Sequence, residues 1–335
     1  YDDSIIVNTL LRGLIDAKAL NSRQAYASEA SEDLYSRRFE QLLRQARDGL
    51  GLSGYDPLAV MPGADEILKL PRAKATWLDE EARSWLSDLG ASSNSQALMV
   101  WHEGRVVFEE YFKEADATAL VISRSLSKPL SVIAVGRAIQ EGFIEGLDQP
   151  ASRYLKEWQG TDKAEITLRY LLQMRSGLAP QSMSAQPEDV MHRAYLHPYH
   201  IEVILEEYPL VTKPGARYDY SNANAELIAP IIERATGRRY EEWLSEAVLR
   251  PLGAAGGDIW VNRIGGTAHS GCCTRLPAET YLRLALLQLQ DGIWQGERLL
   301  PEGYVQQVIT PTATNPPLWY GCLFGRFLYR GAGRR

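Results

Sequence analysis

Hydrophobic and polar positions alternate with different periods in different parts of the chain. The run Ser31–Leu43 has apolar residues at helical spacing after a capping-type start, and residues 78–89 repeat that spacing over a shorter length. Turn signals between Gly49 and Pro62 argue against one continuous helix. Two runs rich in β-branched and aromatic residues then flank Glu103-Gly104, which predicts a hairpin.

From Ser125 onward the pattern becomes helical. Residues 125–250 alternate apolar runs of helix length with Pro and Gly breaks, and further helices are predicted at 277–289 and 301–309. Strand character returns at 319–329. Strands early, helices in the middle and strands at the end predict an α+β fold, an antiparallel sheet flanked by helices with an inserted all-helical lobe.

This order also predicts the domain organisation. We expect a helical N-terminal extension over residues 1–60 and one large domain over residues 61–335, with its helical lobe at about 125–250. The length of 335 residues favours one large domain or two closely joined lobes.

Composition narrows the class of protein. Hydrophobic residues make up 45% and charged residues 23%, with a net charge of -6, which is typical of a globular protein and gives no basic face for nucleic acid. No apolar run is long enough to span a bilayer. The chain begins at Tyr1 instead of Met, so we expect that an N-terminal segment has been removed or left out; this leaves both the cytoplasm and export open.

The cysteines and histidines predict neither a disulfide framework nor a metal site. Cys272, Cys273 and Cys322 are odd in number, and two are adjacent, so we expect small buried or half-buried thiols. His197 and His200 form a pair without an accompanying carboxylate motif, and we expect no metal and no cofactor.

Ser125-Leu-Ser-Lys128 is the first candidate for chemistry. Residues three apart on a helix share a face, so Ser125 and Lys128 can touch at the start of the predicted helix. A backbone N–H at a helix start has no intrahelical partner and can stabilise an oxyanion. A lysine becomes a useful base when burial favours its neutral form, so Lys128 is the candidate base for a Ser125 nucleophile.

Tyr220-Ser-Asn222 is the second candidate. The Pro214-Gly215 turn and a short extended piece precede it, and a helix follows. Residues i and i+2 of an extended segment point the same way, so Tyr220 and Asn222 can face one site. A tyrosine beside an ammonium can carry a proton, and an asparagine can hold a substrate carbonyl.

Together these two motifs resemble those of the serine β-lactamase and penicillin-binding superfamily, in its class C-like branch of esterases, D-amino-acid peptidases and nylon-oligomer amidases. The stretches 144–150, 166–178 and 271–289 resemble the family's neighbouring segments, with Met174 where the family has a histidine. The resemblance covers roughly residues 97–330. It implies acyl-enzyme hydrolysis at Ser125 of a small-molecule ester, amide or peptide, with no cofactor.

This sequence departs from the family's pattern at a third motif. The family carries Lys/His-x-Gly on a late strand, and this sequence has no Lys-Thr-Gly. His269-Ser270-Gly271 fits formally but precedes a helix, and Gly331-Ala332-Gly333 lies near the chain end. We therefore expect a chain whose C-terminal strands are missing, which leaves the second oxyanion donor unassigned.

Three alternatives remain open from the residues. A Ser-His-Asp hydrolase lacks a G-x-S-x-G elbow here. A catalytically silent binding or regulatory protein on the same fold has no chemical reason to keep Ser125, Lys128 and Tyr220 together. Within the enzyme hypothesis, a β-lactamase or D-peptidase competes with an esterase or amidase. The oligomeric state stays undetermined.

Overall fold

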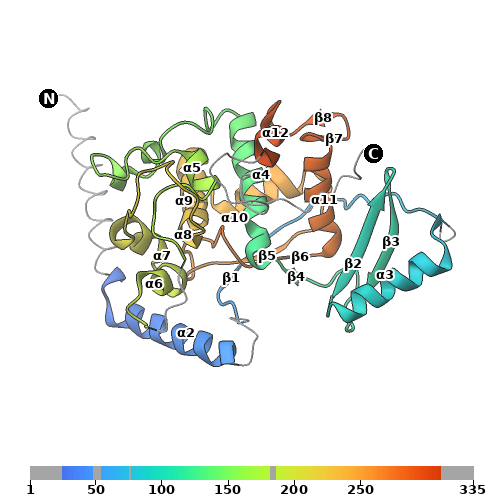
Figure 1. Ribbon diagram of the computed structural model, residues 1–335, viewed down its shortest axis with the longest axis horizontal. Helices are drawn as coiled ribbons and strands as arrows, with labels where there is room; N and C mark the ends of the chain where they lie inside the picture. Colours follow the sequence, from blue (N-terminus) through green and yellow to red (C-terminus); the bar gives the residue numbers. More distant parts are fainter. Residues whose placement is uncertain (1–24, 48–53, 75–76, 182–185, 311–335) are drawn as a thin grey trace.

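The computed structural model describes residues 25–47, 54–74, 77–181 and 186–310 (Figure 1). None of the helices in these ranges is long and apolar enough to cross a membrane. The helices are α2 (Glu29–Arg47), α3 (Glu80–Ser92), α4 (Ser127–Gln140), α5 (Leu168–Leu172), α6 (Val190–Leu196), α7 (His200–Glu202), α8 (Asn222–Glu226), α9 (Ile228–Thr236), α10 (Tyr240–Trp243), α11 (Ala278–Leu289) and α12 (Tyr304–Ile309). Shorter or irregular helical turns are η2 (Arg124–Leu126), η3 (Ala151–Arg153), η4 (Lys156–Trp158), η5 (Val203–Glu207) and η6 (Leu244–Leu249).

The main sheet of the described residues is antiparallel and has the order β1-β5-β6-β4. Its strands are β1 (Leu58–Met61), β5 (Gly257–Trp260), β6 (Thr274–Leu276) and β4 (Val121–Ile122). The edge strand β4 pairs with β6 in the register Val121↔Leu276 and Ile122↔Arg275. This pairing brings the chain just after β4 beside the chain just before β6, although about 150 residues separate the two in sequence.

Helix α4 is the centre of the core. Nearly all of its side chains are buried, because it runs through the middle of the molecule and contacts α9, η6 and η2 (Figure 1). The indole of Trp243 donates to the carbonyl of Ala134 at 3.1 Å, and the phenol of Tyr304 donates to that of Val132 at 2.7 Å. A Cβ on Gly136 would lie 2.7 Å from the Tyr304 ring, so only glycine allows this close approach of α12.

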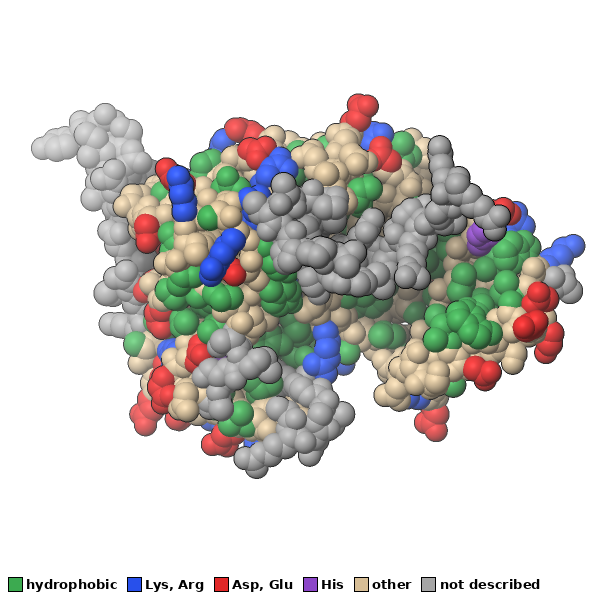
Figure 2. Space-filling view, viewed as in Figure 1, with side chains coloured by type: hydrophobic (Ala, Val, Ile, Leu, Met, Phe, Trp, Pro, Cys, Tyr) green, Lys and Arg blue, Asp and Glu red, His purple; other side chains and the backbone are tan. Residues whose placement is uncertain are grey.

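The hairpin predicted around Glu103-Gly104 is present as β2 (Ala97–His102) and β3 (Arg105–Tyr111), which pair antiparallel with an irregularity after Val100. Helix α3 packs on it, and Gly90 lies where a side chain would overlap the ring of Phe112. A second small hairpin joins β7 (Ile293–Trp294) and β8 (Glu297–Arg298). Figure 2 shows the β2–β3 unit, at the right, set off from the main body by a hollow at the lower edge.

Structure and expectation agree on the α+β class and on the helical lobe. The boundary expected at residue 60 falls inside β1, which pairs with β5, so the end of the helical extension belongs to the main sheet. Pro57 and Pro62, which the sequence pattern presents as turn signals, bracket this short strand. The strand expected at 319–329 and the Gly331-Ala332-Gly333 candidate lie outside the described residues.

Candidate active site

Ser125 stands on a tight turn between β4 and α4. Ser123 donates its backbone N–H to the carbonyl of Thr274 at 2.8 Å, which continues the β4–β6 pairing up to this turn. Arg124 then adopts a left-handed conformation with φ of 45°, which is uncommon for a residue with a side chain. Ser125 is the middle residue of η2 and is exposed, and α4 begins two residues later at Ser127. Such a constrained turn holds the hydroxyl at the surface.

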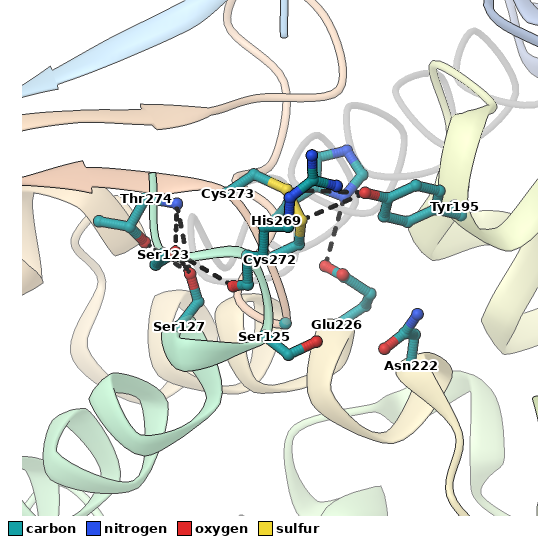
Figure 3. The surroundings of a disulfide bond; sticks show 12 residues. Ser123, Ser125, Ser127, Tyr195, Asn222, Glu226, His269, Cys272, Cys273 and Thr274 are labelled. Atoms are coloured by element: carbon teal, nitrogen blue, oxygen red, sulfur yellow. Dashed lines mark hydrogen bonds and ion pairs between the residues drawn. A yellow bond between two sulfur atoms is a disulfide. The ribbon is translucent and has the colours of Figure 1, made fainter. Parts of the chain in front are cut away.

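A network of buried hydroxyls fixes the turn from below. Ser127 Oγ lies 2.6 Å from Ser123 Oγ and 2.8 Å from Thr274 Oγ1, and the backbone N–H of Thr274 donates to Ser123 Oγ at 3.0 Å (Figure 3). The middle serine of Ser125-Leu-Ser-Lys128 therefore ties α4 to β6. Sequence reasoning missed this role because Thr274 is remote in the chain.

Lys128 and Tyr220 converge on Ser125. Lys128 Nζ and Tyr220 OH each lie 3.2 Å from Ser125 Oγ, and Lys128 Nζ lies 5.2 Å from the centre of the Tyr220 ring. The contact predicted between residues three apart is therefore present. Lys128 Nζ donates to Ser125 Oγ, and the Tyr220 hydroxyl lies within hydrogen-bond reach of the same oxygen, so two groups that can carry a proton meet at Ser125.

Tyr220 and Asn222 face the same site, as their spacing predicts. Ser221 is extended, and α8 begins at Asn222. Tyr220 OH donates to Asn222 Oδ1 at 3.4 Å, and Tyr220 OH lies 3.2 Å from Ser125 Oγ. Through this hydrogen bond Asn222 Oδ1 contacts the phenol that lies beside Ser125.

Lys128 is buried, with 3% of its surface exposed, and donates to the carbonyl of Gly271 at 2.9 Å. Gly271 belongs to the formal match His269-Ser270-Gly271. That tripeptide lies in the turn between β5 and β6, behind Lys128, and not on a strand lining the front of the site. Gly271 of this tripeptide is therefore a hydrogen-bond partner of Lys128.

A second polar cluster lies deeper. The side chains of His200, Glu226 and His269 are fully buried and offer one ligand-type atom each within 4.8 Å of one another. Burial lowers the pKa of His200 to about 4 and also lowers that of His269. Burial alone raises the pKa of Glu226, but the His269 and His200 rings outweigh it and lower the pKa to about 2. Glu226 is therefore an anion facing neutral imidazoles at neutral pH.

The expectation of unpaired thiols was wrong for two of the three cysteines. Cys272 and Cys273 are joined in a disulfide between adjacent residues, with Cα atoms 3.7 Å apart (Figure 3). Counting cysteines tests for bridges that close loops, and it misses a bridge between neighbours. Tyr195 OH lies 3.2 Å from Cys272 Sγ, so the bridge packs on the helical lobe. Cys322 lies outside the described residues.

Curated relatives match parts of the chain. A 6-aminohexanoate-dimer hydrolase of Paenarthrobacter ureafaciens is 27% identical over 221 residues, which are 62% of this chain and 55% of that protein. A monacolin J acid methylbutanoyltransferase of Aspergillus terreus is 34% identical over 113 residues, 33% of this chain and 26% of the relative. The chain thus spans between about a quarter and about half the length of these relatives.

Solved structures share the fold. A Bacillus anthracis protein assigned as a 6-aminohexanoate-dimer hydrolase superposes with a TM-score of 0.66 at 20% identity, covering 78% of this chain and 73% of that one. A D-stereospecific amidohydrolase of Streptomyces gives a TM-score of 0.55 at 21% identity over 74% of this chain and 82% of its own. The beta-lactamase family model matches residues 83–314, which include Ser125, Lys128 and Tyr220. By its fold and by this match, the chain belongs to the beta-lactamase family.

Proposed function

We propose that this protein is a serine hydrolase that acts through an acyl-enzyme on an ester or amide of a small acyl compound. The observation that carries the proposal is the position of Ser125 Oγ, 3.2 Å from both Lys128 Nζ and Tyr220 OH. Ser125 attacks the substrate carbonyl, and its proton passes to the Lys128–Tyr220 pair. The pair returns the proton to the leaving group, and a water molecule then releases the acyl group.

Each group has a separate part in this mechanism. The buried Lys128 shares its hydrogen bonds between Ser125 and Gly271, which keeps its amine aimed at the nucleophile. The phenol of Tyr220, 3.2 Å from Ser125 Oγ, passes the proton to the leaving group. Asn222 orients that phenol and offers an amide to the substrate carbonyl. The backbone N–H of Ser125 supplies one oxyanion donor.

The substrate class rests on the relatives. The names of two of them describe a 6-aminohexanoate-dimer hydrolase and a D-stereospecific amidohydrolase, which favours an amide or ester for this chain. A third structural relative, EstCE1, is described as a hydrolase with promiscuous acyltransferase activity, at a TM-score of 0.57. These names support a carbonyl substrate with a small acyl group.

The test is covalent labelling combined with turnover. The protein is exposed to a fluorophosphonate, its intact mass is measured, and hydrolysis of a p-nitrophenyl ester is followed in parallel. We expect one adduct in the wild type and none in Ser125→Ala, with hydrolysis lost in that variant. Ser92→Ala, at an exposed serine of α3 whose hydroxyl donates to the carbonyl of Leu89, is the matched control and keeps both signals. Full activity in Ser125→Ala would rule the mechanism out.

A further inference from the structure

Glu226 occupies an unusual position for a carboxylate. It ends α8, the helix that starts at Asn222, and none of its surface is exposed. Its Oε2 lies 3.4 Å from His269 Nδ1 and 3.6 Å from His200 Nε2. Within the described residues neither of its oxygens has a hydrogen-bond partner of good geometry, so these two ring nitrogens are the polar atoms that face the carboxylate. A buried carboxylate destabilises the fold unless its neighbours compensate. A role in function would explain why a carboxylate stands at this position.

The protonation pattern of His200 follows from its neighbour Asn262. The Asn262 Oδ1 accepts from the backbone N–H of Thr267 at 2.9 Å and from Arg263 at 3.3 Å, which fixes the amide orientation. Its Nδ2 therefore donates to His200 Nδ1 at 3.0 Å. With Nδ1 as acceptor, the neutral ring carries its proton on Nε2, which points to Glu226.

Ring geometry also favours a proton network over a metal centre. His269 stacks on Trp260 at 3.7 Å with planes 9° apart, and on His200 at 4.1 Å with planes 14° apart. Imidazole lone pairs lie in the ring plane, so two nearly parallel rings direct them along nearly parallel lines. They cannot meet at one ion at the roughly 2.0–2.1 Å that a nitrogen ligand requires. With its Nε2 protonated and its Nδ1 accepting from Asn262, neutral His200 also has no free lone pair for a metal ion.

This cluster touches the backbone that holds the proposed catalytic lysine. A Cβ on Gly271 would lie 2.8 Å from Glu226 Oε1 and 2.9 Å from the Cβ of Ala225, so the end of α8 packs directly on Gly271. Ser270 Oγ donates to the carbonyl of Ala225 at 2.7 Å. The carbonyl of Gly271, on its other side, accepts from Lys128 Nζ at 2.9 Å.

We propose that Glu226 is a positioning residue for the hydrolytic reaction: through His200 and His269 it fixes the turn at residues 269–271, so that the Gly271 carbonyl holds Lys128 against Ser125. Its negative charge, one glycine away from the amine, also stabilises the ammonium that forms when Lys128 takes the serine proton. The inference rests on the proposed function, since it assigns Glu226 a part in that reaction.

The electrostatic surroundings of Glu226 come from several elements. His200 lies on α7 and His269 on the β5–β6 turn. Other titratable or charged groups that interact with Glu226 or with its two histidines include Tyr195 on α6, His197 directly after α6, Tyr240 on α10, Glu202 on α7 and Arg38 on α2. Lys128 on α4 is the cation that shares Gly271 with Glu226. We therefore expect loss of the Glu226 charge to change the electrostatic potential at Lys128.

The test compares Glu226→Gln with Glu226→Asp in the full chain. Glu226→Gln keeps the shape and removes the charge, and we expect kcat for a p-nitrophenyl ester to fall roughly 10- to 100-fold with KM little changed. The acid limb of its kcat/KM profile should move to lower pH by about one unit. Glu226→Asp keeps the charge, so its limb should stay in place. Glu233→Gln, at an α9 carboxylate paired with Arg239, is the matched control.

A purely structural role predicts a lower Tm with an unshifted pH profile in Glu226→Gln, and that result would overturn the proposal. If neither variant folds, ¹⁵N spectra of the wild-type imidazoles decide: His200 must be the Nε2–H tautomer and His269 the Nδ1–H tautomer. Stoichiometric zinc bound by the wild type, or the opposite tautomers, also overturns it. A wild type that neither labels at Ser125 nor hydrolyses esters defeats the proposed function first, whatever the Glu226 variants do.

Discussion

The front and the back of the site differ in exposure and in how their parts come together. At the front, Ser125 is exposed and meets Lys128 and Tyr220 at hydrogen-bond distances. At the back, Glu226 and two histidines are sealed from water. Helix α8 joins the two, because it begins at Asn222 and ends at Glu226 (Figure 3). The nucleophile of such a site can be exposed, while the charged groups proposed to position it, Lys128 and Glu226, are buried.

Tyr220→Phe tests the front with the largest expected loss after removal of the nucleophile. The change deletes only the phenol oxygen that lies 3.2 Å from Ser125 Oγ. We expect kcat for ester hydrolysis to fall about 10²- to 10⁴-fold, because a group that carries a proton in the transition state is lost. Steady-state kinetics measure the effect. An unchanged kcat would mean that Lys128 alone handles the proton.

Gly271→Ala tests the connection between front and back. The new methyl group would overlap Glu226 Oε1 and the Cβ of Ala225, so either the carbonyl that holds Lys128 or the end of α8 must shift. We expect kcat to fall roughly 10- to 100-fold, as expected for misplacement by about an ångström. Gly146→Ala, at a loop glycine where no atom lies within 4 Å of the added carbon and φ is not positive, is the comparison for glycine replacement in general. Equal losses in both variants would break the proposed connection.

The buried cluster of Glu226, His200 and His269 is expected to control how the free energy of unfolding changes at acid pH. His200 has its pKa lowered from 6.5 to about 4, so the unfolded chain binds a proton there that the folded chain does not. Stability is thus present above pH 6.5 and falls as the pH drops toward 4, and the lowered pKa of Glu226 continues the loss from 4.5 toward 2.

Thermal unfolding measured from pH 7 to 4 should show this decline in Tm. His200→Gln should have a shallower decline, although its Tm at pH 7 is lower. The exposed His102 is the control, and His102→Gln should keep the wild-type slope. A slope that is the same in all three proteins would contradict a buried neutral His200.

The same contrast explains what could be predicted from the sequence. Ser125 with Lys128, and Tyr220 with Asn222, are neighbours through local spacing, so helix and strand geometry predict their contacts. The contact between Ser125 and Tyr220, in contrast, was predictable only from the resemblance to a family. Glu226, His200 and His269 come from three separate elements, and no local period connects them.

In the fold, the helices were predictable because their apolar spacing extends over several turns. The short strands β1, β5 and β6 were not, because four residues or fewer give too little alternation, and their pairing depends on distant partners. The disulfide between Cys272 and Cys273 was missed because its ring closes within the local backbone.

The central claim is that Ser125 is a nucleophile activated at the front of this site. Its most direct test is peptide-level mass spectrometry of the wild type after brief exposure to a fluorophosphonate, beside a Lys128→Met variant. The account predicts one adduct, on Ser125, that forms together with the loss of ester hydrolysis and forms far more slowly in Lys128→Met. An adduct on any other serine, or equal labelling of Ser125 in both proteins, would contradict it.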